Sequence, residues 1–253
     1  MDLGLKGLKA IVTGGTKGIG RAITETFVKE GVHVAFCARN AAEVAQTAAE
    51  FSACGVTTIG TVVDVAEGPA LAAWVASAAQ ALGGLDIVVA NVSALAIPNE
   101  EANWQRGFDV DMMGTVRLVN ASMPFLERSQ FASIVTISSV SGREIDFASG
   151  PYGAFKAAIV HYTQGIAYHN AGKGIRANTV SPGNTYFEGG VWNQIETGNP
   201  DLYKIALGLN PTGRMGTPQE MANAVVFLAS PAASFITGTN LVVDGALTKG
   251  VQL

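Results

Sequence analysis

Seven short runs of apolar residues alternate along the chain with longer segments that have the periodicity of amphipathic helices. Within each run the apolar residues are consecutive, as in AIV, DIVVA and SIVTI, rather than alternating with polar ones. Strands with this pattern are buried on both faces, which is typical of parallel sheets covered by helices. The pattern therefore predicts seven parallel strands, at Lys9–Val12, Val32–Cys37, Thr57–Val63, Leu85–Ala90, Ser133–Ser138, Arg176–Ser181 and Asn240–Asp244.

The segments between these runs contain recognisable helix starts and ends. After the first run, apolar residues spaced i, i+3, i+4, i+7 and i+8 from Ile19 form one core-facing stripe, and Gly31 suits a left-handed helix end. Asn40 with Glu43 three residues later resembles a capping box, and Pro218 suits the first turn of a later helix. The alternation predicts an α/β fold with helices on both faces of a doubly wound sheet.

The chain has no feature that divides it into separate domains. Its 253 residues suit one large α/β domain, and it contains no internal repeat, low-complexity tract or linker. We therefore expect a single domain over residues 1–253. Residues 184–216 are the one segment without clear periodicity. A segment of that length without regular structure is often functional in a compact domain, so we expect a substrate lid there.

The composition and charge exclude several classes of protein. Hydrophobic residues make up 48% of the chain and charged residues 14%, which excludes disorder and favours burial of apolar surface in an oligomer. The net charge is −4, and no basic run would neutralise a nucleic-acid backbone. Because we find no secretory leader and no apolar run of about 18 residues, we expect a cytoplasmic protein without a nucleic-acid or membrane partner. Cys37 and Cys54 lack neighbouring ligands, so we expect buried thiols and no metal site.

The first predicted strand runs directly into the glycine-rich sequence TGGTKGIG, from Thr13 to Gly20, which opens the first helix. A pyrophosphate placed there would meet free backbone N–H groups and the positive end of the helix dipole. A tight turn between a strand and a helix also requires glycine, so this motif alone is weak evidence for a dinucleotide site.

A second motif consists of Ser139 followed, thirteen residues later, by Tyr152 and then Lys156. Tyr152 and Lys156 are one helical turn apart and point to the same face. A phenol is a poor base near neutral pH, and a neighbouring ammonium favours its phenolate form. Tyr152 would then exchange a proton with a substrate oxygen that Ser139 holds in place. In isolation, a Tyr and a Lys at this spacing are usually an ordinary surface pair.

With both motifs present, the chain resembles the classical short-chain dehydrogenase/reductase family from about Leu8 to Gly245. The resemblance implies a Rossmann-type fold and a nicotinamide-dependent oxidoreductase. It also implies contacts with the adenine at Asp64, which competes with a capping role, and with the nicotinamide after the sixth strand. The implied cofactor-binding residues are Gly14, Thr16, Lys17, Gly18, Ile19, Gly20, Arg39, Asp64, Val65, Asn91, Tyr152, Lys156, Pro182, Gly183 and Thr185.

The chain departs from the family pattern at three places. The stretch after the fourth strand keeps Asn91 but has Val92-Ser93 in place of a small Ala-Gly pair. Asp111 stands where the family has a fourth active-site residue, an Asn, so we expect Asp111 to belong to the catalytic group. Phe187 replaces a Thr that contacts the nicotinamide region.

The end of the second strand suggests which cofactor is preferred. No acidic residue there accepts hydrogen bonds from a ribose 2′-hydroxyl, whereas Arg39 and Lys17 suit a 2′-phosphate. We therefore predict NADP(H) in preference to NAD(H). Apolar residues in the lid and beside the site suggest a small or medium apolar carbonyl substrate. The expected substrate contacts are Ser93, Val140, Tyr186, Phe187 and Trp192.

These observations predict an oxidoreductase that interconverts a ketone or aldehyde and the corresponding alcohol. A carbonyl reductase, a 3-oxoacyl thioester reductase and an NAD-dependent secondary-alcohol or polyol dehydrogenase all remain open. A non-catalytic dinucleotide sensor on the same fold would be expected to lose Ser139, Tyr152 or Lys156, and all three are present. The segments Thr115–Phe125 and Ala154–Tyr168 resemble the family's dimerising helices, so we expect a homotetramer.

Overall fold

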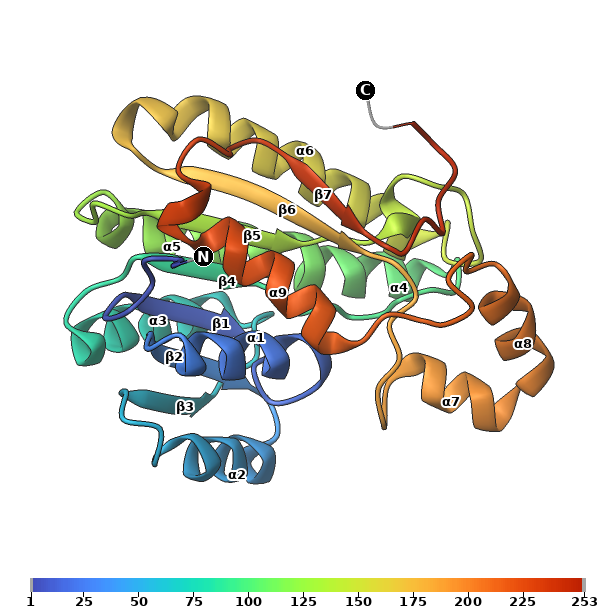
Figure 1. Ribbon diagram of the computed structural model, residues 1–253, viewed down its shortest axis with the longest axis horizontal. Helices are drawn as coiled ribbons and strands as arrows, with labels where there is room; N and C mark the ends of the chain where they lie inside the picture. The colour runs from blue at the N-terminus through green and yellow to red at the C-terminus, as the bar shows by residue number, and fades with distance from the viewer. Residues whose placement is uncertain (1, 252–253) are drawn as a thin grey trace.

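The computed structural model describes residues 2–251 and contains one seven-stranded parallel sheet (Figure 1). The strand order is β3-β2-β1-β4-β5-β6-β7. All seven predicted strands are confirmed, and their ends differ from the predicted ones by at most two residues. The strands are β1 Lys9–Thr13, β2 His33–Ala38, β3 Thr58–Val62, β4 Ile87–Ala90, β5 Ser133–Ile137, β6 Arg176–Pro182 and β7 Asn240–Val243.

Helices cover both faces of the sheet, as predicted. Alternate residues of β1 enter opposite cores: Ala10 and Val12 pack with α1, α2 and α9, whereas Ile11 packs with α3, α5 and α6. This alternation explains why the apolar runs are continuous, since each strand is buried on both sides. The helices that cover the sheet are α1 Gly18–Lys29, α2 Ala41–Phe51, α3 Gly68–Leu82, α5 Gly114–Leu126, α6 Pro151–Asn170 and α9 Pro218–Ala229.

The winding of the sheet reverses between β1 and β4, which are neighbours although two strands separate them in the chain. In open α/β sheets, ligands bind in the crevice at the carboxyl ends of the strands beside such a switch point. The glycine-rich turn follows β1 directly, so the fold brings it to this crevice.

The helical run that precedes β5 is interrupted by a π-helical segment. α4 covers Glu101–Gly107, the π-helical turn covers Phe108–Met113, and α5 continues from there. Such turns often occur at functional sites. Here the turn contains Asp111, whose backbone carbonyl accepts a hydrogen bond from Thr115 Oγ1 at 2.7 Å.

The segment expected to be an irregular lid contains two short helices, α7 Val191–Gly198 and α8 Pro200–Gly208. They form a small apolar cluster of their own around Trp192, Ala206 and Met215. Figure 1 shows both helices, in orange, beside the carboxyl ends of the strands and apart from the helices on the sheet. Each is only about two turns long, so the sequence pattern was too short to reveal a helical period.

The two cysteines have different surroundings. Cys37, in β2, is fully buried, and this burial raises the pKa of its thiol to about 12. Cys54 is exposed, so the expectation of two buried thiols is wrong for Cys54, which follows α2 at the surface. Within residues 2–251, every helix is too short or too polar to cross a bilayer.

Candidate active site

A cavity of about 650 Å³ lies at the carboxyl ends of the strands and extends under the lid. This volume is typical of small-molecule sites. Most of the residues that the sequence assigned to the site line this cavity. They are Gly14, Thr16, Lys17, Gly18, Ile19, Gly20, Arg39, Asp64, Val65, Asn91, Ser93, Ser139, Val140, Tyr152, Lys156, Pro182, Gly183, Thr185, Phe187 and Trp192.

The glycine-rich turn forms a cradle with an open helix end. Gly14 and Gly18 have positive φ values of 70° and 51°, a conformation that side chains disfavour. A Cβ atom on Gly20 would lie 2.1 Å from the Gly14 carbonyl oxygen, so the turn requires glycine there. No side chain among residues 2–251 caps the first turn of α1. Its N–H groups can therefore bind an anion, as a pyrophosphate site requires.

Asn91 joins the glycine-rich turn to the end of β4. Its backbone N–H donates to Thr13 Oγ1 at 3.0 Å, and its side-chain amide donates to the Thr13 carbonyl oxygen, also at 3.0 Å. Asn91 thereby holds the two strands at the switch point in register. Asn91 therefore has a positioning role in addition to its predicted place in the cofactor site.

The Tyr–Lys pair lies on the first turns of α6. Lys156 is 2% exposed, and its Nζ donates to the Ile137 carbonyl oxygen at 3.1 Å. Its own carbonyl oxygen accepts a hydrogen bond from Ser138 Oγ at 2.7 Å, which ties α6 to the end of β5. The Lys156 ammonium lies 5.6 Å from the centre of the Tyr152 ring. This arrangement places a buried positive charge beside the phenol.

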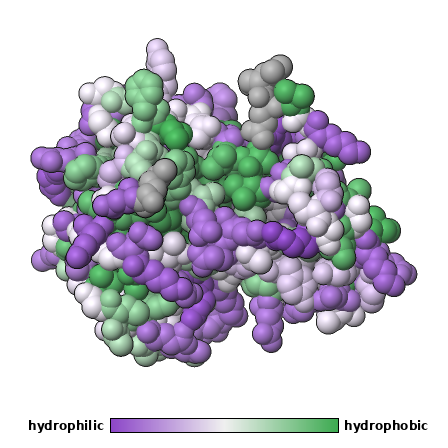
Figure 2. Space-filling model, in the orientation of Figure 1, coloured by the Kyte–Doolittle hydropathy of each residue, from purple (hydrophilic) through white to green (hydrophobic). Residues whose placement is uncertain are grey.

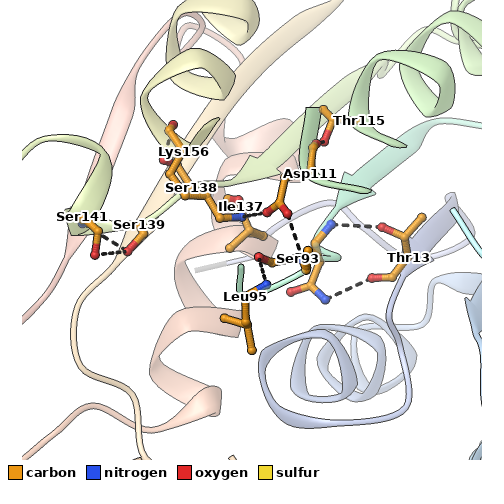
Figure 3. Close-up of polar contacts among 12 residues, drawn as sticks. Thr13, Ser93, Leu95, Asp111, Thr115, Ile137, Ser138, Ser139, Ser141 and Lys156 are labelled. Atoms are coloured by element: carbon orange, nitrogen blue, oxygen red, sulfur yellow. Dashed lines mark hydrogen bonds and ion pairs between the residues drawn. The ribbon is translucent and has the colours of Figure 1, made fainter. Parts of the chain in front are cut away.

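Asp111 forms a buried ion pair with Lys156. The distance from Lys156 Nζ to Asp111 Oδ1 is 3.2 Å, and the two side chains are 2% and 3% exposed. The other carboxylate oxygen, Oδ2, accepts a hydrogen bond from the Ala94 N–H at 2.8 Å. Figure 3 shows Asp111 between Lys156 and the segment that carries Ser93 and Leu95. Asp111 does not line the cavity, so it contacts the catalytic group only through Lys156.

Ser139 belongs to a short chain of hydroxyl groups that ends on a carboxylate. The Ser141 N–H donates to Ser139 Oγ at 3.2 Å, and Ser139 Oγ donates to Ser141 Oγ at 3.3 Å. Ser141 Oγ in turn donates to Asp146 Oδ2 at 2.7 Å. Ser141 and Asp146 also line the cavity. Sequence reasoning missed both, because neither belongs to a motif.

The aromatic residues of the lid are placed differently from one another. Trp192 is 7% exposed and packs edge-on against Phe147 with ring centres 5.7 Å apart, which closes the substrate end of the cavity. The Phe187 ring lies against Gly18, where a Cβ atom would come within 2.5 Å of it. Phe187, expected at the substrate, therefore lies over the glycine-rich turn. Only a residue without a side chain at position 18 permits this approach.

Tyr186 does not line the cavity, contrary to expectation. Its hydroxyl donates to Glu196 and accepts from Asn193, and its ring packs edge-on against Tyr203. The hydrogen bond to the Glu196 carboxylate raises the pKa of the Tyr186 phenol. Tyr186 therefore supports the interior of the lid. The sequence could not show this, because Tyr186 and Phe187 are adjacent and point in different directions.

A glycine-rich turn at the switch point of a parallel sheet, facing a half-buried Tyr152 beside a buried Lys156, defines a class of dinucleotide-dependent oxidoreductases. Residues 14–248 match the family model described as enoyl-(acyl carrier protein) reductase. The chain belongs to the short-chain dehydrogenase/reductase family.

Several relatives match over nearly the whole chain. Isoepoxydon dehydrogenase of Penicillium expansum is 40% identical, and the match covers 100% of this chain and 99% of that protein. 2-(S)-hydroxypropyl-CoM dehydrogenase 3 of Xanthobacter autotrophicus is 32% identical, with coverage of 96% and 98%. Among solved structures, L-sorbose reductase from Gluconobacter frateurii, complexed with NADPH and L-sorbose, is 28% identical with a TM-score of 0.90. That match covers 99% of this chain and 100% of the reductase.

Proposed function

We propose that this chain interconverts a secondary alcohol and the corresponding ketone, or an alcohol and its aldehyde, and prefers NADP(H) to NAD(H). The observation that carries the proposal is that Ser139, Tyr152 and Lys156 line the same cavity as the uncapped end of α1. One end of the cavity thus suits a pyrophosphate, and the other carries groups that can move a proton. The names of the 40% identical isoepoxydon dehydrogenase and of the L-sorbose reductase are consistent with this chemistry.

The cavity has a suitable place for each part of a dinucleotide. The pyrophosphate fits at the first turn of α1, the adenine end near Asp64 and Val65, and the nicotinamide end near Gly183 and Thr185. Bound there, a nicotinamide would supply or accept the hydride. The protein then has to position the substrate oxygen and exchange its proton.

Tyr152 is the group that would exchange this proton. In alcohol oxidation its phenolate takes the hydroxyl proton of the substrate, and in carbonyl reduction its phenol returns a proton to the same oxygen. The buried Lys156 ammonium favours the phenolate by charge. Ser139 Oγ would donate a hydrogen bond to the reacting oxygen, and its present contact with Ser141 is long enough, at 3.3 Å, to be exchanged readily.

Asp111 would modulate this proton exchange through Lys156. Its carboxylate holds the ammonium in place and offsets part of its positive charge. The family Asn at this position has no charge, so Asp111 makes phenolate formation at Tyr152 harder than an Asn would. Asp111 is therefore a positioning residue in this proposal rather than a group that contacts the substrate.

The substrate end of the cavity favours a compact and largely apolar molecule. Several apolar side chains line the cavity: Leu95 after β4, Val140 after β5, and Phe147 with Trp192 at the lid. Asp146 and Arg106 both line the cavity, so its charged side chains do not by themselves select for or against an anionic substrate. The apolar lining supports a neutral carbonyl or alcohol, with a 3-oxoacyl thioester and a polyol as weaker alternatives.

The proposed assembly is a homotetramer. Trp104 and Phe108 are 40% and 43% exposed and pack against Phe155 on α6, so an apolar surface covers this part of α4 and α6. Figure 2 shows a second group of hydrophobic residues around β7 on the face in view. Apolar patches of this kind are typically covered by a partner. Light scattering should give four times the monomer mass, and a monomer at micromolar concentration would contradict the proposal.

The reaction class can be tested with the wild-type protein. A panel of matched secondary alcohols and ketones is offered with NADP⁺ or NADPH and with NAD⁺ or NADH, and the absorbance of the reduced nicotinamide is followed. We expect turnover in both directions, with higher kcat/KM for the phosphorylated cofactor. Binding of the cofactor without turnover of any pair would favour the sensor hypothesis instead.

A further inference from the structure

Four charged side chains, those of Lys17, Arg39, Glu43 and Asp64, line the end of the cavity where the adenosine would lie. Lys17 and Arg39 are the two basic residues expected to bind a 2′-phosphate, and Glu43 lines the same end. The two basic residues are matched in number by two carboxylates, Glu43 and Asp64, so this end has no net positive charge. The sequence assigned Glu43 only to a capping box with Asn40, whereas the structure places it in the lining of the cavity.

Glu43 forms a direct ion pair with Lys17. Lys17 Nζ and Glu43 Oε1 are 2.7 Å apart, the distance of a close ion pair. The Lys17 side chain is 68% exposed, whereas that of Glu43 is 25% exposed. The carboxylate is thus the more fixed partner, and the lysine is the partner that has to move if it is to bind a phosphate.

Further contacts hold the Glu43 carboxylate in place. Asn40 Nδ2 donates to Glu43 Oε1 at 2.9 Å, and Thr16 Oγ1 donates to Glu43 Oε2 at 3.3 Å. The Glu43 N–H donates to Asn40 Oδ1, so the residue is also part of the capped first turn of α2. A carboxylate with three donors does not turn away easily when an anion approaches.

The Arg39 side chain differs from that of Lys17, which is held in an ion pair. The side chain of Arg39 is exposed and lines the cavity, and it forms no ion pair or hydrogen bond with any residue from 2 to 251. Its guanidinium is therefore available to a phosphate, with the planar set of donors that suits a bidentate contact. Of the two predicted phosphate ligands, one is free and the other is engaged.

We propose that Glu43 is a specificity-determining residue that weakens the preference of this enzyme for NADP(H). Its carboxylate holds Lys17 in an ion pair and repels the 2′-phosphate, while Arg39 alone attracts it. The inference rests on the proposed function, because it requires the dinucleotide to bind in this cavity. The site then discriminates less strongly between NADP(H) and NAD(H) than the pair Lys17 and Arg39 alone would predict.

The test is the change in binding caused by Glu43→Gln, a substitution that removes the charge and keeps the size and an oxygen acceptor. Dissociation constants are measured by fluorescence titration for NADPH and NADH, and by competition for 2′,5′-ADP and 5′-AMP. These readouts do not depend on turnover. The matched control is Glu50→Gln, because Glu50 lies on the same helix and pairs with Arg21, but does not line the cavity.

We expect Glu43→Gln to lower the dissociation constants of NADPH and 2′,5′-ADP by about 3- to 10-fold, the size expected for a partly exposed charge near a phosphate. NADH and 5′-AMP should change less than about twofold, and the gain should shrink at high salt. Glu50→Gln should change none of the four constants.

Two results would overturn the inference and leave the proposed function intact. The first is an unchanged ratio between NADPH and NADH in Glu43→Gln. The second is weaker NADH binding in that variant, which would mean that Glu43 accepts a hydrogen bond from the ribose 2′-hydroxyl. If the wild-type protein binds none of the four compounds, the proposed function fails and the inference fails with it.

Discussion

The wall of the cavity formed by β5 and α6 is anchored in the sheet, whereas the opposite wall, formed by α7 and α8, rests on a small core of its own. On the first wall, Lys156 is held by the Ile137 carbonyl oxygen, by Asp111 and through its backbone by Ser138. On the second, Trp192 packs within an apolar cluster that includes only three buried side chains among the described residues.

This difference separates the two tasks of the site. A proton-transfer group has to be held within tenths of an ångström, and buried polar contacts to the sheet provide that precision. A substrate wall can vary without disturbing the main core, because its cluster shares no residue with the two clusters that flank the sheet. We therefore expect substitutions on the first wall to change rate and stability, and those on the lid to change substrate binding.

The largest effect is expected for Lys156→Met. The substitution removes the charge that favours the Tyr152 phenolate, so turnover should fall by about 10³-fold. It also leaves the Asp111 carboxylate buried without its partner, which should lower the free energy of unfolding by about 3–5 kcal/mol. Urea unfolding and steady-state turnover measure the two effects.

A double variant separates stability from catalysis. Lys156→Met combined with Asp111→Asn removes both buried charges, so most of the lost stability should return while activity stays low. If the double variant is as unstable as Lys156→Met, the ion pair is not the reason for the instability.

A smaller and different effect is expected for Trp192→Ala on the lid. Loss of the ring removes the contact with Phe147 and opens the substrate end of the cavity. KM for an apolar substrate should rise by about 10-fold while kcat changes little, because the lost contacts bind substrate and transition state alike. A fall in kcat with constant KM would show that the lid takes part in the chemical step.

A shift in pH dependence, without a large loss of rate, is expected for Asp111→Asn. Removing the negative charge beside Lys156 leaves more of its positive charge to act on Tyr152, so the rising limb of alcohol oxidation should move to lower pH. An unchanged profile would mean that the carboxylate has no influence on the phenol. Loss of activity at every pH would place Asp111 in the proton relay itself.

The elements that follow from short-range patterns could be predicted from the sequence. Continuous apolar runs gave the seven strands, and the fixed spacing of Ser139, Tyr152 and Lys156 indicated a common site. The strands and the pairing of Tyr152 with Lys156 depend on neighbours within one or two helical turns, which the sequence shows directly. Ser139 lies outside that range and was assigned to the site by its match to the family pattern.

The features that depend on distant parts of the chain could not be predicted in the same way. Asp146 reaches Ser139 only through Ser141 and a loop, and Glu43 meets Lys17 only because α2 returns beside the glycine-rich turn. Phe187 and Tyr186 are adjacent in sequence, yet one lies on Gly18 and the other inside the lid. Tertiary packing decides which way such side chains point, and no local spacing encodes it.

The central claim, that Tyr152 exchanges a proton with the substrate in a dinucleotide-dependent reaction, is tested most directly by Tyr152→Phe. The variant loses only the hydroxyl oxygen, so NADPH binding and turnover are measured on the same preparation, with circular dichroism to confirm folding. We predict an NADPH dissociation constant within about twofold of the wild-type value and a loss of turnover of about 10³-fold or more. Substantial turnover by the folded variant would contradict the account.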